Sequence, residues 1–513
     1  MTASTRLGRG FVGVFGVGLA CAGTGSLGCV SDPAPAESVS DEAGESGISA
    51  SDATMGSADS GSVTASASGA SSATASATGT DSSGGGSAEG PKWDVGGDSA
   101  TGDTGFDTEY DGPGSCRQSE AYGAAGGYPT FDDPGYADFL GKQVLFMTSY
   151  AYQGNEYELR AIDVSGDPPP PNLNYAAPIW SHPTWTSQTF GGGIFGLTLD
   201  SYGNIYLASS RVYGNSSTPG TIYKVDKDTA AVSVFATLPN TGPAFGNINY
   251  DCNSETIRVV SHEDCRIYQL DMNGDVVSTF SHGLGDVTIG DANDPGEPDG
   301  LFCPLGQRMW AVQSHYGRIY YSVWWEDSGR PNADEGNEIW SVAFDENGIP
   351  DPDTDQLEAT MPPLLGTHSN PVSDLSFAAT GWMLVSERTM YADTSTSAHQ
   401  SLTYELQQVN GTWNNVGSTY LVGGPEIPNN AAGGVDHDFA AGGYVWMTGD
   451  ALDFYSPDVV YGLQGTPYGG GGVEISTLID HDNEVTQQDK TAQGDCEIPI
   501  PGDVEPPPPP PEG

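Results

Sequence analysis

The chain has 513 residues, of which 16 are Lys or Arg and 68 are Asp or Glu, so its formal net charge is −52. This charge repels nucleic acid and anionic lipid surfaces, and it excludes nucleic acid as a partner. Cations, basic proteins and neutral ligands such as sugars remain compatible with it, although an acidic surface also simply keeps an exported protein soluble.

Residues 1–28 have the pattern of an export signal. Two arginines precede a short apolar run that is too short to span a membrane as a helix. The segment ends in SLGC, which resembles the lipobox of bacterial lipoproteins, with Leu27 two rather than three residues before Cys29. The resemblance implies lipidation of Cys29, with Cys21 as a competing position. Signal cleavage near Gly28 without lipidation is the alternative.

A lipid anchor on Cys29 predicts a location in the bacterial cell envelope, as an outer-membrane lipoprotein, whereas cleavage alone predicts secretion. Residues 29–115 are rich in Ser, Gly, Ala, Thr and Asp, a composition that cannot bury a core. We expect them to form a disordered tether that holds the folded part away from a membrane. Residues 501–513 form a Pro-rich tail, which we expect to be extended.

Residues 116–500 contain a repeated pattern of alternating apolar segments, which predicts β-strands. One type of segment recurs at intervals of 52 to 64 residues, as in GNIYLASS (from Gly203), GRIYYSVW (from Gly317) and GYVWMTG (from Gly443). A second type, such as TIYKVD (from Thr221), follows each of them, and further strands precede and follow this pair. Turns rich in Asp, Asn and Gly separate the strands.

Four antiparallel strands, here called A to D, repeated about six times predict an all-β fold, a six-bladed β-propeller. Seven blades are the alternative, because strand A of the first blade is not recognisable. The blade rhythm and the I-Y-x-V/L-D segments resemble propellers of the NHL and SMP-30/gluconolactonase-like superfamily. This resemblance implies a fold and leaves the activity open.

The repeat also predicts where a site would lie. The A–B and C–D turns are short and share one face, so the longer B–C and D–A connections share the opposite face, here called the loop face. The connections assigned to it are residues 281–304, 324–337, 353–371, 386–401, 424–433 and 450–458. Loops presented by a rigid scaffold commonly carry function, so the loop face is the predicted binding surface.

Two groups of candidate ligand-binding residues fall on this face. Oxygen donors at the close spacing that Ca²⁺ prefers occur at Asp291, Asn293, Asp294, Glu297 and Asp299, although a solvated loop is the alternative. Ligand contacts are predicted for Trp324, Trp325, Glu387, Arg388 and Asp450. The aromatic pair suits a sugar, with packing of a loop on its blade as the alternative, and Glu387 with Arg388 also suits a structural ion pair.

The sequence favours a binding or structural module over an enzyme, with a protein or carbohydrate ligand on the loop face. It contains neither a Gly-x-Ser-x-Gly elbow nor a His-Glu-x-x-His pair, so no catalytic residue is assigned. The alternative is a metal-dependent hydrolase or lactonase of the SMP-30-like kind, which holds a metal in the propeller channel. Three or more ligands converging on the axis would favour the enzyme, and a plugged channel would favour the module.

Five cysteines follow the signal region, and export predicts that they pair. Cys252 ends a strand at the short-turn face, whereas Cys265 and Cys303 both lie at the loop face. A strand rises roughly 17 Å, and a disulfide requires Cα atoms within about 7 Å. The prediction is therefore Cys265–Cys303. Cys116 with Cys496 is predicted to clasp the two ends of the propeller, which leaves Cys252 as a free buried thiol.

Overall fold

Every residue described below lies within residues 101–513. The computed structural model describes residues 127–150, 157–166, 176–214, 216–252, 254–282, 300–325, 336–345, 347–362, 368–378, 381–424, 429–438, 443–455, 458–483 and 491–499. The signal, Cys29, the tether and the Pro-rich tail therefore lie outside the described residues. Among the described segments, no helix is both long enough and apolar enough to cross a membrane.

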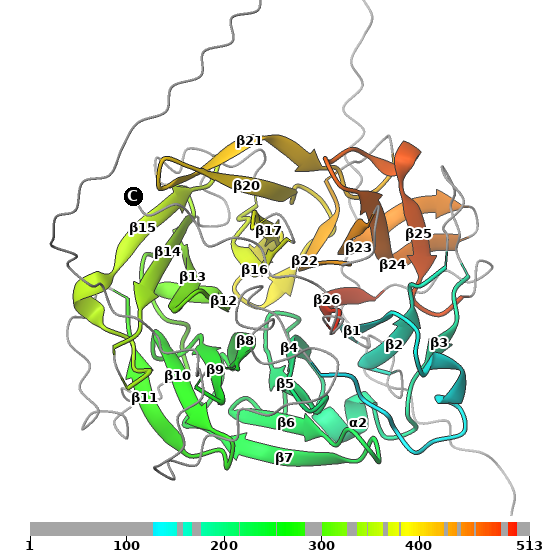
Figure 1. Ribbon diagram of the computed structural model, residues 1–513, viewed down its shortest axis with the longest axis horizontal. Helices are drawn as coiled ribbons and strands as arrows, with labels where there is room; N and C mark the ends of the chain where they lie inside the picture. Colours follow the sequence, from blue (N-terminus) through cyan, green and yellow to red (C-terminus); the bar gives the residue numbers. More distant parts are fainter. Residues whose placement is uncertain are drawn as a thin grey trace, which may run out of the picture. The chain divides into compact units, whose positions relative to one another are not determined.

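The described residues form six four-stranded antiparallel sheets arranged around a central axis (Figure 1), which confirms the six-bladed propeller. The strands of each blade are given from the innermost to the outermost. Blade 1 consists of β26 (Ala492–Glu497), β1 (Val144–Tyr150), β2 (Leu159–Asp163) and β3 (Ile179–Trp180), blade 2 of β4 (Ile194–Leu199), β5 (Ile205–Ser209), β6 (Thr221–Val225) and β7 (Val232–Thr237), and blade 3 of β8 (Phe245–Asp251), β9 (Thr256–Ser261), β10 (Arg266–Asp271) and β11 (Val276–Phe280). Blade 4 consists of β12 (Arg308–His315), β13 (Arg318–Trp324), β14 (Glu338–Ala343) and β15 (Gln356–Thr360), blade 5 of β16 (Val372–Phe377), β17 (Met383–Glu387), β20 (Thr403–Val409) and β21 (Thr412–Tyr420), and blade 6 of β22 (Ala431–His437), β23 (Tyr444–Tyr455), β24 (Asp458–Pro467) and β25 (Thr477–Asp480).

Smaller elements decorate the blades. They are a β-hairpin of β18 (Met390–Ala392) and β19 (Ser395–Thr396), the short helix α2 (Ser187–Phe190), and the single 3-10 turns η1 (Ala137–Phe139), η3 (Pro352–Thr354) and η4 (Val473–Ile475). The hairpin lies in the B–C connection of blade 5, between β17 and β20. It therefore belongs to the loop face.

Strand A of the first blade, which is not recognisable in the sequence, is β26, the last strand of the described chain. β26 pairs antiparallel with β1, where Phe146 opposes Glu497 and Tyr150 opposes Ala492. In Figure 1 the red strand β26 lies beside the cyan strand β1. The ring is therefore closed by hydrogen bonds between strands from opposite ends of the described chain.

The predicted turn chemistry is confirmed at the short-turn face. In the β10–β11 turn, Oδ1 of Asp271 accepts hydrogen bonds from the amides of Asn273 and Asp275, each over 2.9 Å. The turn closes at Gly274, whose φ of +87° suits glycine. The β14–β15 connection begins in the same way at Asp345. The Asp-x-x-Gly pattern thus sets where strands C and D separate.

Several residues predicted as loops belong to strands. The range 353–371 contains β15, and 450–458 contains the ends of the long β23–β24 hairpin. Four of the five residues of the outermost strand β15 are exposed or half-buried, so the strand lacks the apolar content by which buried strands are recognised. The alternating segment VEISTLI, from Val473, is a strand only from Thr477 on, because its first residues form the 3-10 turn η4.

The cysteines agree with the sequence prediction in part. Cys265 and Cys303 form a disulfide with a Cα–Cα distance of 5.4 Å, as the blade geometry predicted. Cys496 is a free, buried thiol, so the predicted Cys116–Cys496 clasp is wrong. Cys496 sits inside β26, where it packs against blades 1 and 6. Cys252 is disulfide-bonded, so the prediction of a free thiol there is also wrong, and Cys116 lies outside the described residues.

Candidate functional site at the propeller axis and the loop face

Each inner strand shifts register against its neighbour at a similar level of the blade. The shifts occur at Ile194/Leu197, Phe245/Ile248, Met309/Val312, Val372/Asp374, Ala431/Val435 and, opposite β26, Met147/Ser149. Such a shift adds a residue to one strand and re-aims its side chains. Polar side chains from different blades accordingly meet at the axis.

Asp374 in β16 connects several blades through its buried carboxyl group. Its Oδ1 accepts a hydrogen bond from Nδ2 of Asn247 in blade 3 over 2.9 Å, and its Oδ2 accepts one from the amide of Val435 in blade 6 over 2.8 Å. Burial and the nearby carboxyl group of Asp495 in blade 1 raise its pKa. Groups from blades 1, 3, 5 and 6 therefore meet around this carboxyl group.

Asp436 and Asp495 connect neighbouring blades in the same manner. Oδ2 of Asp495 accepts from the amide of Leu197 in blade 2 over 3.0 Å, and Oδ2 of Asp436 accepts from the amide of Ile498 over 2.7 Å. Oδ1 of Asp436 accepts from Oγ of Ser376 in blade 5 over 2.8 Å. In both residues, Oδ1 also accepts from the amide of the following residue.

Asp374, Asp436 and Asp495, here called the axial carboxylates, therefore use all six oxygens as acceptors for protein donors. A metal ion in a channel requires carboxylate oxygens that point into shared space. Here these oxygens hold the blades together instead. The arrangement is that of a structural hub, and fully satisfied buried networks of this type rigidify a fold.

Burial raises the pKa of two of the axial carboxylates, Asp374 and Asp495. It raises the pKa of Asp495 to about 7, and burial together with the charges of Asp495 and Glu497 raises the pKa of Asp374 well above its usual range. Burial and the nearby Asp436 and Asp495 also raise the pKa of Glu497. The raised pKa values of Asp374 and Asp495 favour a proton shared between this pair of buried carboxyl groups.

We expect the stability of the propeller to fall as the pH rises from about 5 to about 8. A carboxyl group with a raised pKa in the folded state stabilises the fold fully below its ordinary pKa, and this contribution is lost as the pH rises through the folded value, here about 7 for Asp495. The slope is at most about 1.4 kcal/mol per pH unit for one proton. Melting temperatures measured across this range should decline by a few degrees.

The matched variants for this prediction are Asp374→Asn and Asp271→Asn. The first removes the shared proton and should flatten the decline. In Asp271 the pKa is lowered, against the effect of burial, by hydrogen bonds from the turn. Its contribution is lost only as the pH falls, so this variant should keep the decline at neutral pH. A wild-type melting temperature that is constant over the range would contradict the shared-proton assignment.

The loop-face end of the axis contains a buried ion pair. Nη2 of Arg388 donates to Oδ2 of Asp450 over 2.7 Å, and both side chains are almost fully buried. Nη1 of Arg388 donates to the carbonyl oxygens of Ala432 and Gln493, and Oδ1 of Asp450 accepts from the amide of Gln493. The pair therefore ties blades 5 and 6 to the closing strand β26.

An aromatic cluster lies next to this ion pair. It combines Phe195 from blade 2, Tyr213 from the loop after β5, Trp310 and Trp324 from blade 4, and Met390 from β18. The rings of Phe195 and Trp310 are 5.1 Å apart, and those of Trp310 and Trp324 are 5.8 Å apart. Because these side chains come from three blades and are buried, they fill the mouth of the axis.

The residues predicted to contact a ligand are mostly packed into this region. Trp324 is buried and its indole N–H donates to Ser369, which matches the packing alternative. The Trp325 indole N–H donates to Glu338 over 2.8 Å. No ion pair between Glu387 and Arg388 is found in the part of the chain that the structure describes: Oε2 of Glu387 accepts from the amide of Leu402, and Arg388 pairs with Asp450. The predicted Ca²⁺ ligands from Asp291 to Asp299 lie outside the described residues.

One group of possible metal ligands is found among the described residues. Asp480, His481 and Asp482 follow one another at the end of β25, and one ligand atom from each lies within 4.8 Å of the others. The group lies at the loop face, because strand D of a blade ends there. It is not among the metal ligands predicted from the sequence.

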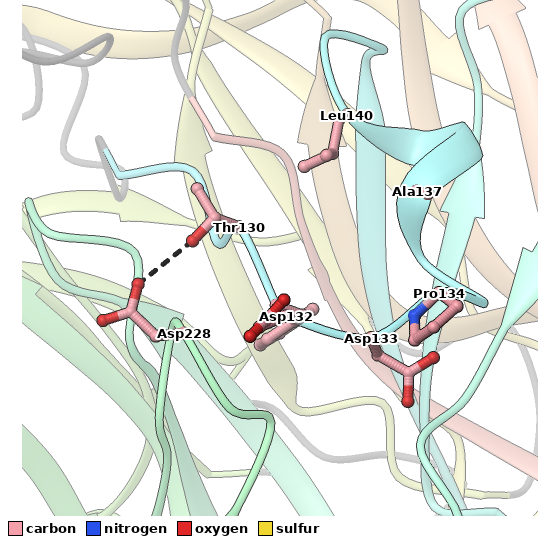
Figure 2. Close-up of a pocket in the computed structure, with 8 residues that line it drawn as sticks. Thr130, Asp132, Asp133, Pro134, Ala137, Leu140 and Asp228 are labelled. Carbon is pink, nitrogen blue, oxygen red and sulfur yellow. Dashed lines mark hydrogen bonds between the residues drawn. The ribbon is translucent and has the colours of Figure 1, made fainter.

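A pocket of about 370 Å³ lies elsewhere, beside the β6–β7 turn (Figure 2). Phe131 and Leu140 contribute its apolar part, and Asp132, Asp133 and Asp228 its carboxylates. Figure 2 shows the hydrogen bond from Thr130 to Asp228, 3.1 Å long, that joins its two sides. The pocket is at the short-turn face and therefore does not coincide with the predicted binding surface.

Comparisons with known proteins found similarity to solved structures only. No family model matches the sequence, and no curated protein sequence matches it. Similar solved structures include a nidogen/laminin complex (12% identity, TM-score 0.40, covering 69% of this chain and 98% of that one), the periplasmic gluconolactonase of Pseudomonas aeruginosa (12%, 0.38, 71% and 100%) and a protein from Lactobacillus plantarum (9%, 0.38, 70% and 99%). At these identities and TM-scores, no ligand or reaction transfers to this chain.

Proposed function

We propose that this protein is an exported binding module that recognises its ligand on the loop face. The axial carboxylates support a module over a channel enzyme, because their oxygens are engaged by protein donors. The buried ion pair and aromatic cluster fill the mouth of the axis. Recognition then depends on the connections around that mouth rather than on a cavity within the ring.

The observation that supports this proposal is an exposed tyrosine on a hairpin whose position is fixed by hydrogen bonds and an ion pair. Tyr391 in β18 is 61% exposed, while the preceding residue, Met390, is buried in the aromatic cluster. Backbone hydrogen bonds run in both directions between Met390 and Ser369, and Asp393 forms an ion pair with Arg308 over 2.7 Å. A contact residue that is already fixed loses little entropy on binding, which favours affinity.

The net charge of the chain limits the chemical classes of ligand that the loop face can bind. A net charge of −52 disfavours polyanions, so an uncharged glycan is the first candidate and a basic protein surface the second. Tyrosine suits both, since an aromatic ring stacks on the apolar face of a sugar and is enriched at the centres of protein interfaces. Anchoring through Cys29 would hold the propeller at the surface of a membrane of the cell envelope. Labelling of Cys29 by a fatty acid tests the anchoring separately from ligand binding.

Binding of the full chain to an array of neutral oligosaccharides tests the proposal. We expect Tyr391→Ala to lose about 2 kcal/mol of binding free energy, the loss typical of a central aromatic contact. The control is Tyr202→Ala, because Tyr202 is 51% exposed but lies in the β4–β5 turn at the opposite face. Equal losses in both variants would contradict a loop-face site. Lactone hydrolysis that disappears in Asp374→Asn would favour the enzyme instead.

A further inference from the structure

The end of β25 carries three adjacent side chains of metal-ligand type. Asp480 and His481 are buried, Asp482 is half-buried, and one ligand atom of each lies within 4.8 Å of the other two. Clustered carboxylates alone are common on an acidic protein. What distinguishes this cluster is the burial of two of its members, which removes the water that would otherwise solvate them.

Asp480 is buried without a full set of partners. The residue is 1% exposed, and its Oδ2 has no hydrogen-bond partner among the described residues. Oδ1 lies 3.5 Å from Nδ1 of His481. A buried carboxylate oxygen that accepts no hydrogen bond is costly, because desolvation is not offset. A bound cation beside Oδ2 would offset this cost.

The backbone of the neighbouring strand orients His481. The carbonyl oxygen of Tyr461 in β24 accepts from the His481 amide over 2.8 Å and lies 3.1 Å from Nδ1 of the ring. A carbonyl oxygen can only accept, so this contact places the ring proton on Nδ1. Histidine ligands of metal ions typically donate one ring N–H to a backbone carbonyl in this manner, which fixes the tautomer and the orientation of the ring.

We propose that Asp480, His481 and Asp482 form a binding site for a divalent cation of the Zn²⁺ class. Imidazole and carboxylate together suit Zn²⁺, whereas Ca²⁺ prefers oxygen ligands only. Three protein ligands leave a fourth position for water, and the half-buried Asp482 gives access from solvent. The site goes beyond the proposed recognition function and does not depend on it.

The position of the site gives the metal a structural role. Asn483 follows the cluster directly and exchanges two hydrogen bonds with the backbone of Ala177, which precedes β3 in blade 1. The cluster therefore lies at the junction between the last blade and the first. Because a cation that binds the folded state stabilises it, Zn²⁺ should strengthen this junction and raise the melting temperature.

Calorimetric titration of the full chain with Zn²⁺, in excess Mg²⁺ to occupy non-specific carboxylates, tests the proposal. We expect one site per chain. Loss of a group that only hydrogen-bonds to a metal ligand lowers the affinity for the metal about 10- to 100-fold. Asp480→Asn and His481→Gln change the ligands themselves, so each should lower the affinity for Zn²⁺ by at least about 100-fold. Asp275→Asn is the control, because it removes the same charge from an exposed position at the short-turn face. Its affinity should stay within the error of the wild type.

Two further measurements separate a site from a folding defect. Co²⁺ should give visible absorption bands with the wild type that disappear in His481→Gln. In the presence of a chelator, Asp480→Asn should melt at the same temperature as the wild type or higher, because it removes a buried charge whose Oδ2 has no hydrogen-bond partner among the described residues. Stoichiometric Zn²⁺ binding that persists in both variants would overturn the proposal, as would binding that Ca²⁺ abolishes by competition.

Discussion

Replacement of Arg388 by methionine is expected to destabilise the propeller by about 3–5 kcal/mol, the cost typical of breaking a buried ion pair. The substitution leaves Asp450 buried with no cation, and burial already raises the pKa of this carboxyl group while Arg388 favours its charged form. It also removes the donors for the carbonyl oxygens of Ala432 and Gln493. Denaturant unfolding followed by tryptophan fluorescence measures the loss.

The matched control is an ion pair of the same length at the surface. Lys227 lies 2.7 Å from Asp228, whose side chain is 58% exposed. Lys227→Met should therefore cost less than about 1 kcal/mol. Addition of Asp450→Asn to Arg388→Met should recover part of the stability, because the uncompensated charge is removed. If Arg388→Met costs no more than Lys227→Met, Arg388 does not hold the blades together.

Removal of the Cys265–Cys303 disulfide should cost about 4 kcal/mol in the chain-entropy treatment of a loop of this size. The two cysteines are 38 residues apart, so the bond restricts a long segment of the unfolded chain. In the folded state it joins the β9–β10 connection to the approach to β12. The measurement is the unfolding free energy of the Cys265→Ala/Cys303→Ala double variant under oxidising conditions.

Comparison between variants is preferable to adding a reductant, because Cys252 is also disulfide-bonded. Cys496→Ala provides the control, since Cys496 is a free buried thiol. Its loss should be about 1 kcal/mol, as for the removal of a small buried group. A double variant no less stable than Cys496→Ala would show that the disulfide contributes little.

The blades were predictable because their middle strands follow a simple rule. The segments from Gly203 and Gly317 alternate apolar and other residues, and both became second strands of blades, β5 and β13. β26 escaped prediction because its sequence, AQGDCE, is mostly polar or small. It is buried on both sides, but its buried groups are largely polar: the Asp495 carboxylate accepts a hydrogen bond from the amide of Leu197, and the backbone carbonyl of Gln493 accepts from Tyr213 and Arg388.

The axial carboxylates were missed for a related reason. Asp374 in β16 and Asp436 in β22 lie in equivalent innermost strands. The signal available in the sequence was therefore an aspartate that recurs inside equivalent strands of two repeats. The partner of Arg388 could not be predicted from the sequence. Its neighbour Glu387 was the expected partner, but adjacent residues of a strand point to opposite sides. The observed partner, Asp450, is 62 residues away in the chain. Contacts that link different blades depend on ring closure, which a single repeat does not reveal.

The closing strand β26 also has a consequence for biosynthesis. Until residue 497 has been synthesised, β1 has no inner partner and blade 1 keeps an open edge. Open strand edges pair readily with other chains, so an incompletely synthesised chain is the species most exposed to aggregation. Late closure means that chaperones have their longest opportunity to act before the ring forms. A translational truncation before Ala492 would yield a product that quality-control proteases recognise.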